Sequence, residues 1–113
     1  MKYTESLKKN NDFRIVYRRG KSVANRLLVL YKFPNKTDSN RLGISVSKKV
    51  GNSVVRSRIT RLIRESYRAQ EEQVSTGWDL VIIARNPANG ATFHEISKSM
   101  EHLFKKQKVY ESK

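Results

Sequence analysis

Apolar residues recur along this chain with two spacings, one typical of helices and one typical of strands. Helices are indicated where apolar residues return every three or four positions. Strands are indicated where β-branched and aliphatic residues form short runs bounded by turn-forming residues. In chain order these patterns predict a helix over about 10–19, one strand or two short ones over 22–33, a strand over 42–47, a helix from 54 to about 70, a strand over 79–84 and a last helix that begins near 93.

The first predicted helix carries two aromatic residues on its apolar face. Phe13 and Tyr17 lie four positions apart, and Gly20 is placed to stop the helix. Asn10 or Asn11 is suited to cap its first turn. The aromatic pair could consist of ordinary core residues or form an accessible surface, and the spacing alone leaves both possibilities open.

The segment from 42 to 47 alternates between apolar and very small residues. Its even-numbered positions are leucine, isoleucine and valine, whereas its odd-numbered positions are Gly43, Ser45 and Ser47. A strand face made of such small side chains is either an ordinary solvent-facing side or the floor of a shallow groove. The loop 34–40 before it is rich in turn-forming residues, and we expect it to connect the strands on either side as a hairpin.

The later part of the chain predicts a buried strand and then a capped helix. Residues 79–84 contain a continuous apolar run, as expected for a strand covered on both faces. A long helical crossover precedes this run, which predicts parallel pairing with the earlier sheet. Thr92 and Glu95 match a capping box. The apolar positions of the last helix are expected to be Phe93, Ile96, Met100, Leu103 and Phe104.

The chain carries a large excess of positive charge. Its 113 residues, most simply one domain, include 24 lysines and arginines against 10 acidic residues, for a net charge of +14. This excess is more than solubility requires and indicates a polyanionic partner, above all nucleic acid. Binding to an anionic lipid surface would instead require a helix with a free apolar face, and the predicted helices need theirs for the core.

The second predicted helix concentrates positive charge on one side. At 100° per residue, Arg61, Arg64 and Arg68 share the face opposite the apolar arc, and Arg56 and Arg58 flank it. Guanidinium groups suit phosphate oxygens, and the positive N-terminal end of the helix adds a further anion site. The apolar arc is expected to comprise Val55, Ile59, Leu62, Ile63 and Ala69.

The sequence contains little of the chemistry that a protein enzyme needs. The absence of cysteine excludes disulfides and cysteine-based zinc or nucleophile sites and favours the reducing cytoplasm. There is no Gly-rich phosphate loop and no His/Asp/Glu metal motif, and we assign no chemistry to His94 or His102. No apolar run could span a membrane, so we expect a cytoplasmic protein with neither a membrane partner nor a small-molecule substrate. If phosphodiester chemistry is involved, another component should supply the catalytic groups.

Several blocks of this sequence together resemble the bacterial ribonuclease P protein family. They are NDFRIVYRRGKS, SVANRLLVLY, RLGISVSKKVGNSVVRSRITRLIRESYR and DLVIIARNP, followed by a helix with SMEHLF, and they cover roughly residues 8–108. The resemblance implies an α+β fold of order αβββαβα, a two-layer sandwich with a left-handed βαβ crossover. Residues 1–113 would then form a single ribonuclease P protein domain, in which we expect 1–9 and 109–113 to be frayed.

The resemblance also implies a function. In this family a large RNA subunit is a ribozyme that uses RNA-bound Mg²⁺ to remove the 5′ leader of precursor tRNA, and the basic protein binds that RNA and the leader. We therefore expect the ribonuclease P RNA subunit, with one protein per RNA, and precursor tRNA as partners, and no cofactor bound by the protein alone. The residues implied in binding the catalytic RNA are Lys48, Lys49, Asn52, Arg56, Ser57, Arg58, Arg61, Arg64 and Arg68. Those implied in binding the leader are Phe13, Tyr17, Tyr31, Ser45, Ser47, Arg56 and Ser57.

The sequence departs from the family signature at Ser57, where asparagine is usual between two arginines, and at Thr60, where lysine is usual. Serine lacks the paired donor and acceptor of an amide, which puts any base-specific hydrogen bond at position 57 in question. Two rival functions remain. A general structured-RNA-binding module, such as a ribosomal or assembly protein, shares the charge but needs no leader groove. An autonomous nuclease would need the metal cluster that the sequence lacks.

Overall fold

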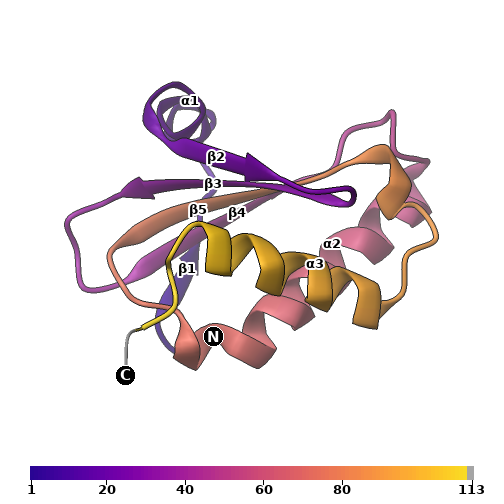
Figure 1. Ribbon diagram of the computed structural model, residues 1–113. Coiled ribbons are helices and arrows are strands. Elements are labelled where there is room, and N and C mark those ends of the chain that lie inside the picture. The colour runs from indigo at the N-terminus through magenta and orange to yellow at the C-terminus, as the bar shows by residue number, and fades with distance from the viewer. Residues whose placement is uncertain (112–113) are drawn as a thin grey trace.

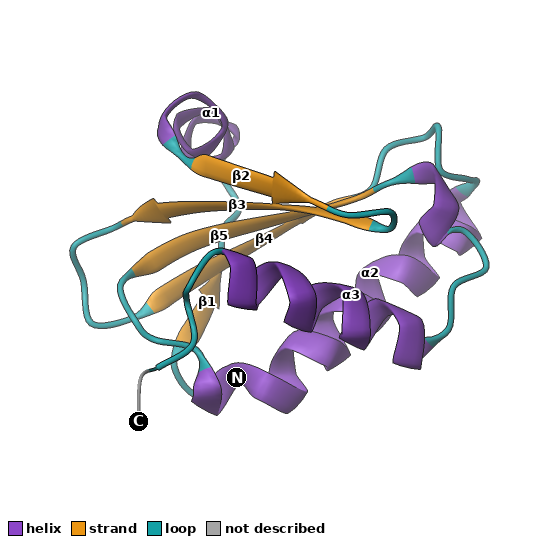
Figure 2. Ribbon diagram, in the orientation of Figure 1, coloured by secondary structure: helices purple, strands orange, loops and turns teal. Residues whose placement is uncertain are grey.

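The computed structural model describes residues 1–111 and shows a five-stranded sheet with helices against both of its faces (Figures 1 and 2). The α+β class is confirmed, and the predicted order αβββαβα follows one additional short strand. Short 3₁₀ turns follow α2 and β5. The elements are β1 (Thr4–Ser6), α1 (Asn10–Arg19), β2 (Lys21–Ala24), β3 (Leu28–Pro34), β4 (Asn40–Ser45), α2 (Ser53–Gln70), β5 (Trp78–Ala84) and α3 (Phe93–Lys106).

The sheet is mixed, with the strand order β1-β4-β5-β3-β2. The central strand β5 pairs in parallel with β4 and antiparallel with β3. The predicted parallel pairing of β5 is therefore confirmed, whereas the predicted hairpin across loop 34–40 is wrong, because β5 lies between β3 and β4. The apolar run of β5 occupies the centre since both of its faces are covered there. The hand of the β4–α2–β5 crossover stays a prediction taken from the family resemblance.

The segment 22–33 forms two strands because Asn25 turns the chain between them. The side-chain oxygen of Asn25 accepts hydrogen bonds from the N–H groups of Leu27 (3.3 Å) and Leu28 (3.0 Å). The same oxygen accepts a hydrogen bond from the Ser99 hydroxyl of α3 at 2.7 Å. Asparagine favours turns through such bonds to nearby backbone. Here it also ties the β2–β3 hairpin to α3.

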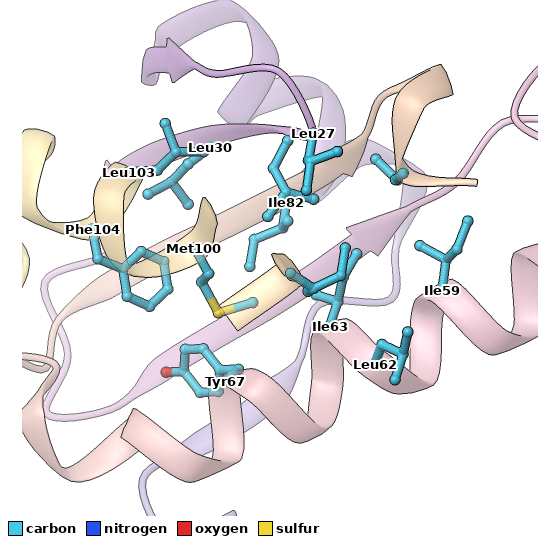
Figure 3. Packing of buried hydrophobic residues seen from close by; sticks show 14 of the residues in the cluster. Leu27, Leu30, Ile59, Leu62, Ile63, Tyr67, Ile82, Met100, Leu103 and Phe104 are labelled. Atoms are coloured by element: carbon cyan, nitrogen blue, oxygen red, sulfur yellow. The ribbon is translucent and has the colours of Figure 1, made fainter. Parts of the chain in front are cut away.

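Each face of the sheet packs against different helices. On one face α2 and α3 cover strand residues such as Leu30, and Figure 3 shows Tyr67 and Phe104 among the side chains on this side. The two rings meet edge to face with their centroids 6.1 Å apart. On the other face α1 buries Val16 against Val81 of β5. The helix α1 therefore lies alone on its side of the sheet, as Figure 1 shows.

The predicted helix starts are confirmed for α2 and α3 but not for α1. The side chain of Asn52 caps α2 by accepting a hydrogen bond from the Val55 N–H at 3.0 Å. Thr92 and Glu95 form both bonds of the predicted capping box. The predicted asparagine cap of α1 is wrong, because Lys9 occupies the N-cap position and makes no side-chain capping bond. That helix is held by its contacts with the sheet instead.

Gly20 ends α1 as predicted, but close packing rather than backbone conformation requires glycine there. Its φ is −74°, which any residue adopts. A Cβ atom at this position would lie 2.5 Å from the Val16 carbonyl oxygen and 2.9 Å from the Lys32 carbonyl oxygen. Glycine therefore allows the end of α1 to approach β3 closely.

The expectation that residues 1–9 are frayed is wrong. Residues Thr4–Ser6 pair in parallel with β4, and Leu7 is buried. The carboxylate of Glu71 accepts hydrogen bonds from the N–H groups of Lys2 (2.9 Å) and Tyr3 (3.0 Å). The N-terminal segment is therefore ordered by two partners that are distant in sequence, the edge of β4 and the buried carboxylate of Glu71.

The expectation of fraying over 109–113 is wrong at its start. Val109 is buried, and Tyr110 forms a β-bridge with Val74. The ring of Tyr110 also packs edge to face on Phe104, with 5.8 Å between the centroids. Residues 112–113 lie outside the described part of the chain.

Two apolar positions expected in the core are exposed. Ala69 of α2 is accessible, and Phe93 retains 43% exposure. Ala69 lies about 120° around the helix from Ile63, and Tyr67 takes its place in the core with no exposed surface. Phe93 is the first residue of α3 and lies at the outer end of that helix. The other predicted core positions of α3 are buried.

Candidate nucleic-acid interface

The basic face of α2 is directed to solvent, as its spacing predicts. Arg61, Arg64 and Arg68 are exposed, while Ile59 and Ile63 on the other side are fully buried. The apolar residues fix the rotation of the helix on the sheet, so the arginines can only face outward. The other predicted RNA-binding residues are also accessible, fully for Lys48, Lys49, Asn52, Ser57 and Arg58 and partly for Arg56.

These cations have no acidic partner within residues 1–111. The ion pairs of the described chain join Lys2 to Glu72, Lys105 to Glu101, and Arg41 to two aspartates. No arginine of α2 takes part in any of them. Unpaired guanidinium groups on one helix face are suited to bind an external anion such as a phosphate.

A groove of about 440 Å³ runs between the basic face of α2 and the end of β4. It brings several predicted RNA-binding residues together with the apolar edge of the sheet. Thr60 lies in this groove and donates a hydrogen bond to the Arg56 carbonyl oxygen at 2.9 Å. The groove is lined by Ile44, Val46, Ser53, Arg56, Ser57, Thr60, Arg61 and Arg64.

The predicted aromatic residues form a cluster between α1 and the sheet. The ring centroids of Phe13 and Tyr17 lie 6.2 Å apart, and those of Tyr17 and Tyr31 lie 5.2 Å apart in an edge-to-face arrangement. Phe13 and Tyr31 are partly buried against the small core under α1. Tyr17 retains 39% exposure. Of the two α1 aromatics, Phe13 therefore packs inward as a core residue, whereas Tyr17 presents an accessible ring.

A second groove of about 420 Å³ lies beside this cluster. It is lined by Asn10, Phe13, Arg14, Tyr17, Ile44 and Ser45.

The hydroxyl of Tyr17 keeps its proton at neutral pH. Burial raises its pKa, a hydrogen bond with the Ser45 side chain lowers it in part, and the neighbouring Tyr31 raises it further. The net effect is a pKa above the ordinary value of 10.0. The groove therefore offers a neutral phenol, which can both donate and accept hydrogen bonds, together with an aromatic face.

The face of β4 that carries the small residues lies under α1. Of these small residues, only Ser45 lines the groove. A Cβ atom on Gly43 would lie 2.6 Å from the ring of Phe13, so this position is filled by that ring. Ser47 lies beyond the end of β4, is exposed, and is not among the residues that line the groove.

The two grooves meet at Ile44. This residue lines both of them, because β1 pairs only with residues 40–42 of β4 and leaves the following edge of that strand open. The alternation of β4 places Ile44 on the core face, and for that reason it is not among the site residues predicted from the sequence. Its edge position could be predicted only from the strand order.

Arg41 is a partly exposed cation that, unlike the arginines of α2, is paired with carboxylates. Its guanidinium donates to both carboxylate oxygens of Asp79, at 2.9 and 2.6 Å, and to the carboxylate of Asp12 at 3.2 Å. The hydrogen bond with Asp79 raises the pKa of Arg41. Because Asp12 lies on α1 and Asp79 on β5, Arg41 joins α1 to the sheet.

Other features of the described chain lie outside this site. Residues 1–111 contain no group of three or more His, Cys, Asp or Glu side chains that could hold a metal ion. None of the helices formed by these residues has the length and apolarity needed to cross a membrane. A larger hollow, of about 1160 Å³, lies by the C-terminal end of α2 and is lined by Glu71, Glu72, Glu101 and Glu111 among others. Its lining also contains Lys2, Lys105 and Arg68, the last of which belongs to the predicted RNA-binding set, so positive and negative side chains are mixed there.

Comparisons with known proteins agree with this geometry. The Ribonuclease P family model matches residues 1–108. The ribonuclease P protein component of Clostridium kluyveri is 55% identical over 106 residues, covering 92% of this chain and 95% of the relative. That of Alkaliphilus metalliredigens is 50% identical over 109 residues, covering 96% and 98%.

Solved structures of RNase P proteins share the fold. The protein from Staphylococcus aureus superposes with a TM-score of 0.87 at 46% identity, covering 94% of this chain and 97% of that chain. The protein from Thermotoga maritima gives a TM-score of 0.83 at 29% identity, covering 90% and 96%. The chain therefore belongs to the ribonuclease P protein family.

Proposed function

We propose that this chain is the protein subunit of the ribonuclease P ribonucleoprotein, and that it binds the catalytic RNA and the 5′ leader of precursor tRNA to assist removal of that leader. The main support for this proposal is that the basic groove beside α2 and the aromatic groove beside α1 meet at Ile44. A structured RNA held in the first and a single strand held in the second would lie side by side on one protein.

The basic groove and the outer face of α2 are proposed to bind the ribonuclease P RNA, with one protein per RNA. Arg56, Arg61 and Arg64 line the groove and have no acidic partner among the described residues. Bidentate guanidinium contacts and the positive N-terminal end of α2 favour phosphate oxygens. Lys48, Lys49, Asn52, Ser57, Arg58 and Arg68 extend the same surface.

The aromatic groove is proposed to bind the leader as a single strand. Single-stranded RNA is commonly recognised by stacking its bases on aromatic side chains, and each such contact contributes about 1–3 kcal/mol. Tyr17 presents the accessible ring, Tyr31 supports it edge to face, and Ser45 leaves room beside it. Stacking tolerates any base, which suits a protein that must accept many leaders.

The chemistry of cleavage is proposed to belong to the RNA subunit. Mg²⁺ ions held by that RNA would supply the activation of the attacking water and the stabilisation of the leaving oxygen. The protein contributes positive charge close to where RNA strands and metal ions must be brought together. It also positions the substrate, which lowers the barrier by reducing the entropy lost on reaction.

Cleavage by the RNA subunit at low Mg²⁺ tests the proposal. Adding the protein should raise kcat/KM for a precursor tRNA, because the protein supplies charge and leader contacts that high Mg²⁺ otherwise replaces. No improvement on adding the protein would favour the general RNA-binding module. Cleavage by the protein in preparations free of RNA would favour the autonomous nuclease.

A further inference from the structure

We propose that Arg14 and Arg18 of α1 form a second basic wall of the aromatic groove and bind phosphates of the leader. This inference rests on the proposed function, since it requires a single strand in that groove. It adds to the leader site two cations that neither the sequence pattern nor the family signature indicates.

Arg14 lies in the lining of the aromatic groove together with Phe13 and Tyr17, and Arg18, which is not among the lining residues, lies one turn along the same edge of α1. At 100° per residue, Arg14 lies about 60° around the helix from Tyr17, and Arg18 lies about 40° further along the same edge. The buried residue Val16 fixes this rotation, because it must face the sheet.

Both arginines are free to bind an external anion. They are exposed, and neither belongs to an ion pair among residues 1–111. Asp12 is the one acidic residue within α1, and its carboxylate is bonded to Arg41 at 3.2 Å. Because Asp12 is paired with Arg41, no acidic residue of α1 compensates the positive charges of Arg14 and Arg18.

The resulting groove has cations on either side of an aromatic ring. Arg14 and Arg18 lie on one side of Tyr17 on α1, and across Ile44 the basic groove of α2 contains Arg56 and Arg61. A nucleotide stacked on Tyr17 carries a phosphate on each side of its base. The α1 wall is suited to bind one of these phosphates, a contact that does not depend on sequence.

The chain offers a matched control on the same helix. Arg19 is also exposed and carries the same charge, but it lies about 160° around α1 from Tyr17. Replacing it removes one positive charge from α1 without touching the groove edge.

The experiment uses the holoenzyme, reconstituted from the RNA subunit and the Arg14→Gln, Arg18→Gln, Arg19→Gln or Tyr17→Ala protein. Binding of a precursor tRNA and of mature tRNA is measured over a range of salt concentrations. Arg14→Gln and Arg18→Gln should each weaken precursor binding about two- to fivefold and reduce the log–log salt slope by about 0.7, with mature tRNA binding unchanged. Arg14→Lys should retain most of the affinity, and Arg19→Gln should match the wild type.

Two outcomes would overturn the inference. One is a precursor affinity of Arg14→Gln and Arg18→Gln that equals that of Arg19→Gln while Tyr17→Ala loses leader binding, which leaves the proposed function standing. The other is an equal loss of affinity for precursor and mature tRNA, which places the arginines on the tRNA body or the RNA subunit. If Tyr17→Ala also shows no leader-dependent loss, the proposed leader groove itself is wrong.

Discussion

Gly43 has no side chain, and the ring of Phe13 occupies the space where one would lie. Leu7 also comes within 3.2 Å of the same position. The glycine therefore sets how closely α1 approaches β4, and with it where the accessible ring of Tyr17 lies. At the scale of single residues, the shape of the aromatic groove therefore depends on glycine at position 43 as well as on the aromatic residues.

The variant Gly43→Ala should destabilise the protein by about 1–3 kcal/mol, because its Cβ would overlap the Phe13 ring unless α1 moves away from the sheet. Urea denaturation measures this change. Ser45→Ala, two residues along the same strand face, is the control and should shift the midpoint far less. Equal midpoints for Gly43→Ala and the wild type would show that Phe13 does not constrain this position.

At the scale of elements, the short strand β1 depends on one buried carboxylate. Glu71 is only 4% exposed and accepts hydrogen bonds from the N–H groups of Lys2 and Tyr3. Burial alone would raise the pKa of Glu71, but hydrogen bonds from Thr4, Lys2 and Tyr3 and the nearby N-terminal charge together lower it below 4.5. The folded protein therefore holds this carboxylate in its charged form.

The docking of β1 should consequently be sensitive to acid. Because its pKa is lower in the folded protein than in the unfolded one, Glu71 stabilises the fold above pH 4.5 and loses this contribution as the pH falls through the lower folded value. Glu71→Gln should reduce the free energy of unfolding by about 1–3 kcal/mol at pH 7, and the difference from the wild type should shrink below pH 4.5.

The neighbouring Glu72 provides the control for this measurement. Its side chain is 74% exposed and makes only a surface ion pair with Lys2 at 3.6 Å. Denaturant unfolding of Glu72→Gln should follow the wild type closely between pH 7 and pH 3. A pH-independent deficit for Glu71→Gln would mean that the carboxylate charge does not hold β1.

Elements with a local signal were predictable from the sequence, and those that depend on distant partners were not. The periodicity of the apolar residues and the Thr92–Glu95 capping box predict the three helices well. A strand of three residues such as β1 has no period to detect, and it forms only because β4 offers an edge. The hairpin prediction failed since nothing near loop 34–40 indicates that β5 inserts between β3 and β4.

The candidate site shows the same division. The alternation of β4 and the spacing of Phe13 and Tyr17 were compatible with a groove that the family resemblance implied, and the structure brings Tyr17, Tyr31 and Ser45 together. The roles of Ile44 and Arg41 could not be predicted, because one follows from the strand order and the other from the position of two aspartates far away in sequence.

At the scale of the whole molecule, charge and shape divide the surface. The net charge is +14, and four of the ten acidic residues lie around the hollow at the C-terminal end of α2, together with Lys2, Arg68 and Lys105. The opposite half of α2 and the outer edge of α1 present unpaired arginines around the two joined grooves. Positive charge without an acidic partner among the described residues therefore surrounds the two grooves, where an aromatic ring is also accessible.

One side of the protein is proposed to bind structured RNA, while the adjoining groove binds the leader. The most direct test is the affinity of the reconstituted holoenzyme for precursor tRNA relative to mature tRNA, measured with wild-type, Tyr17→Ala and Arg64→Gln protein. Tyr17→Ala should weaken precursor binding by about 1–3 kcal/mol and leave mature tRNA binding unchanged. Arg64→Gln should weaken assembly with the RNA subunit without changing that ratio. Equal losses for both RNAs with Tyr17→Ala, or no loss for either, would contradict the account.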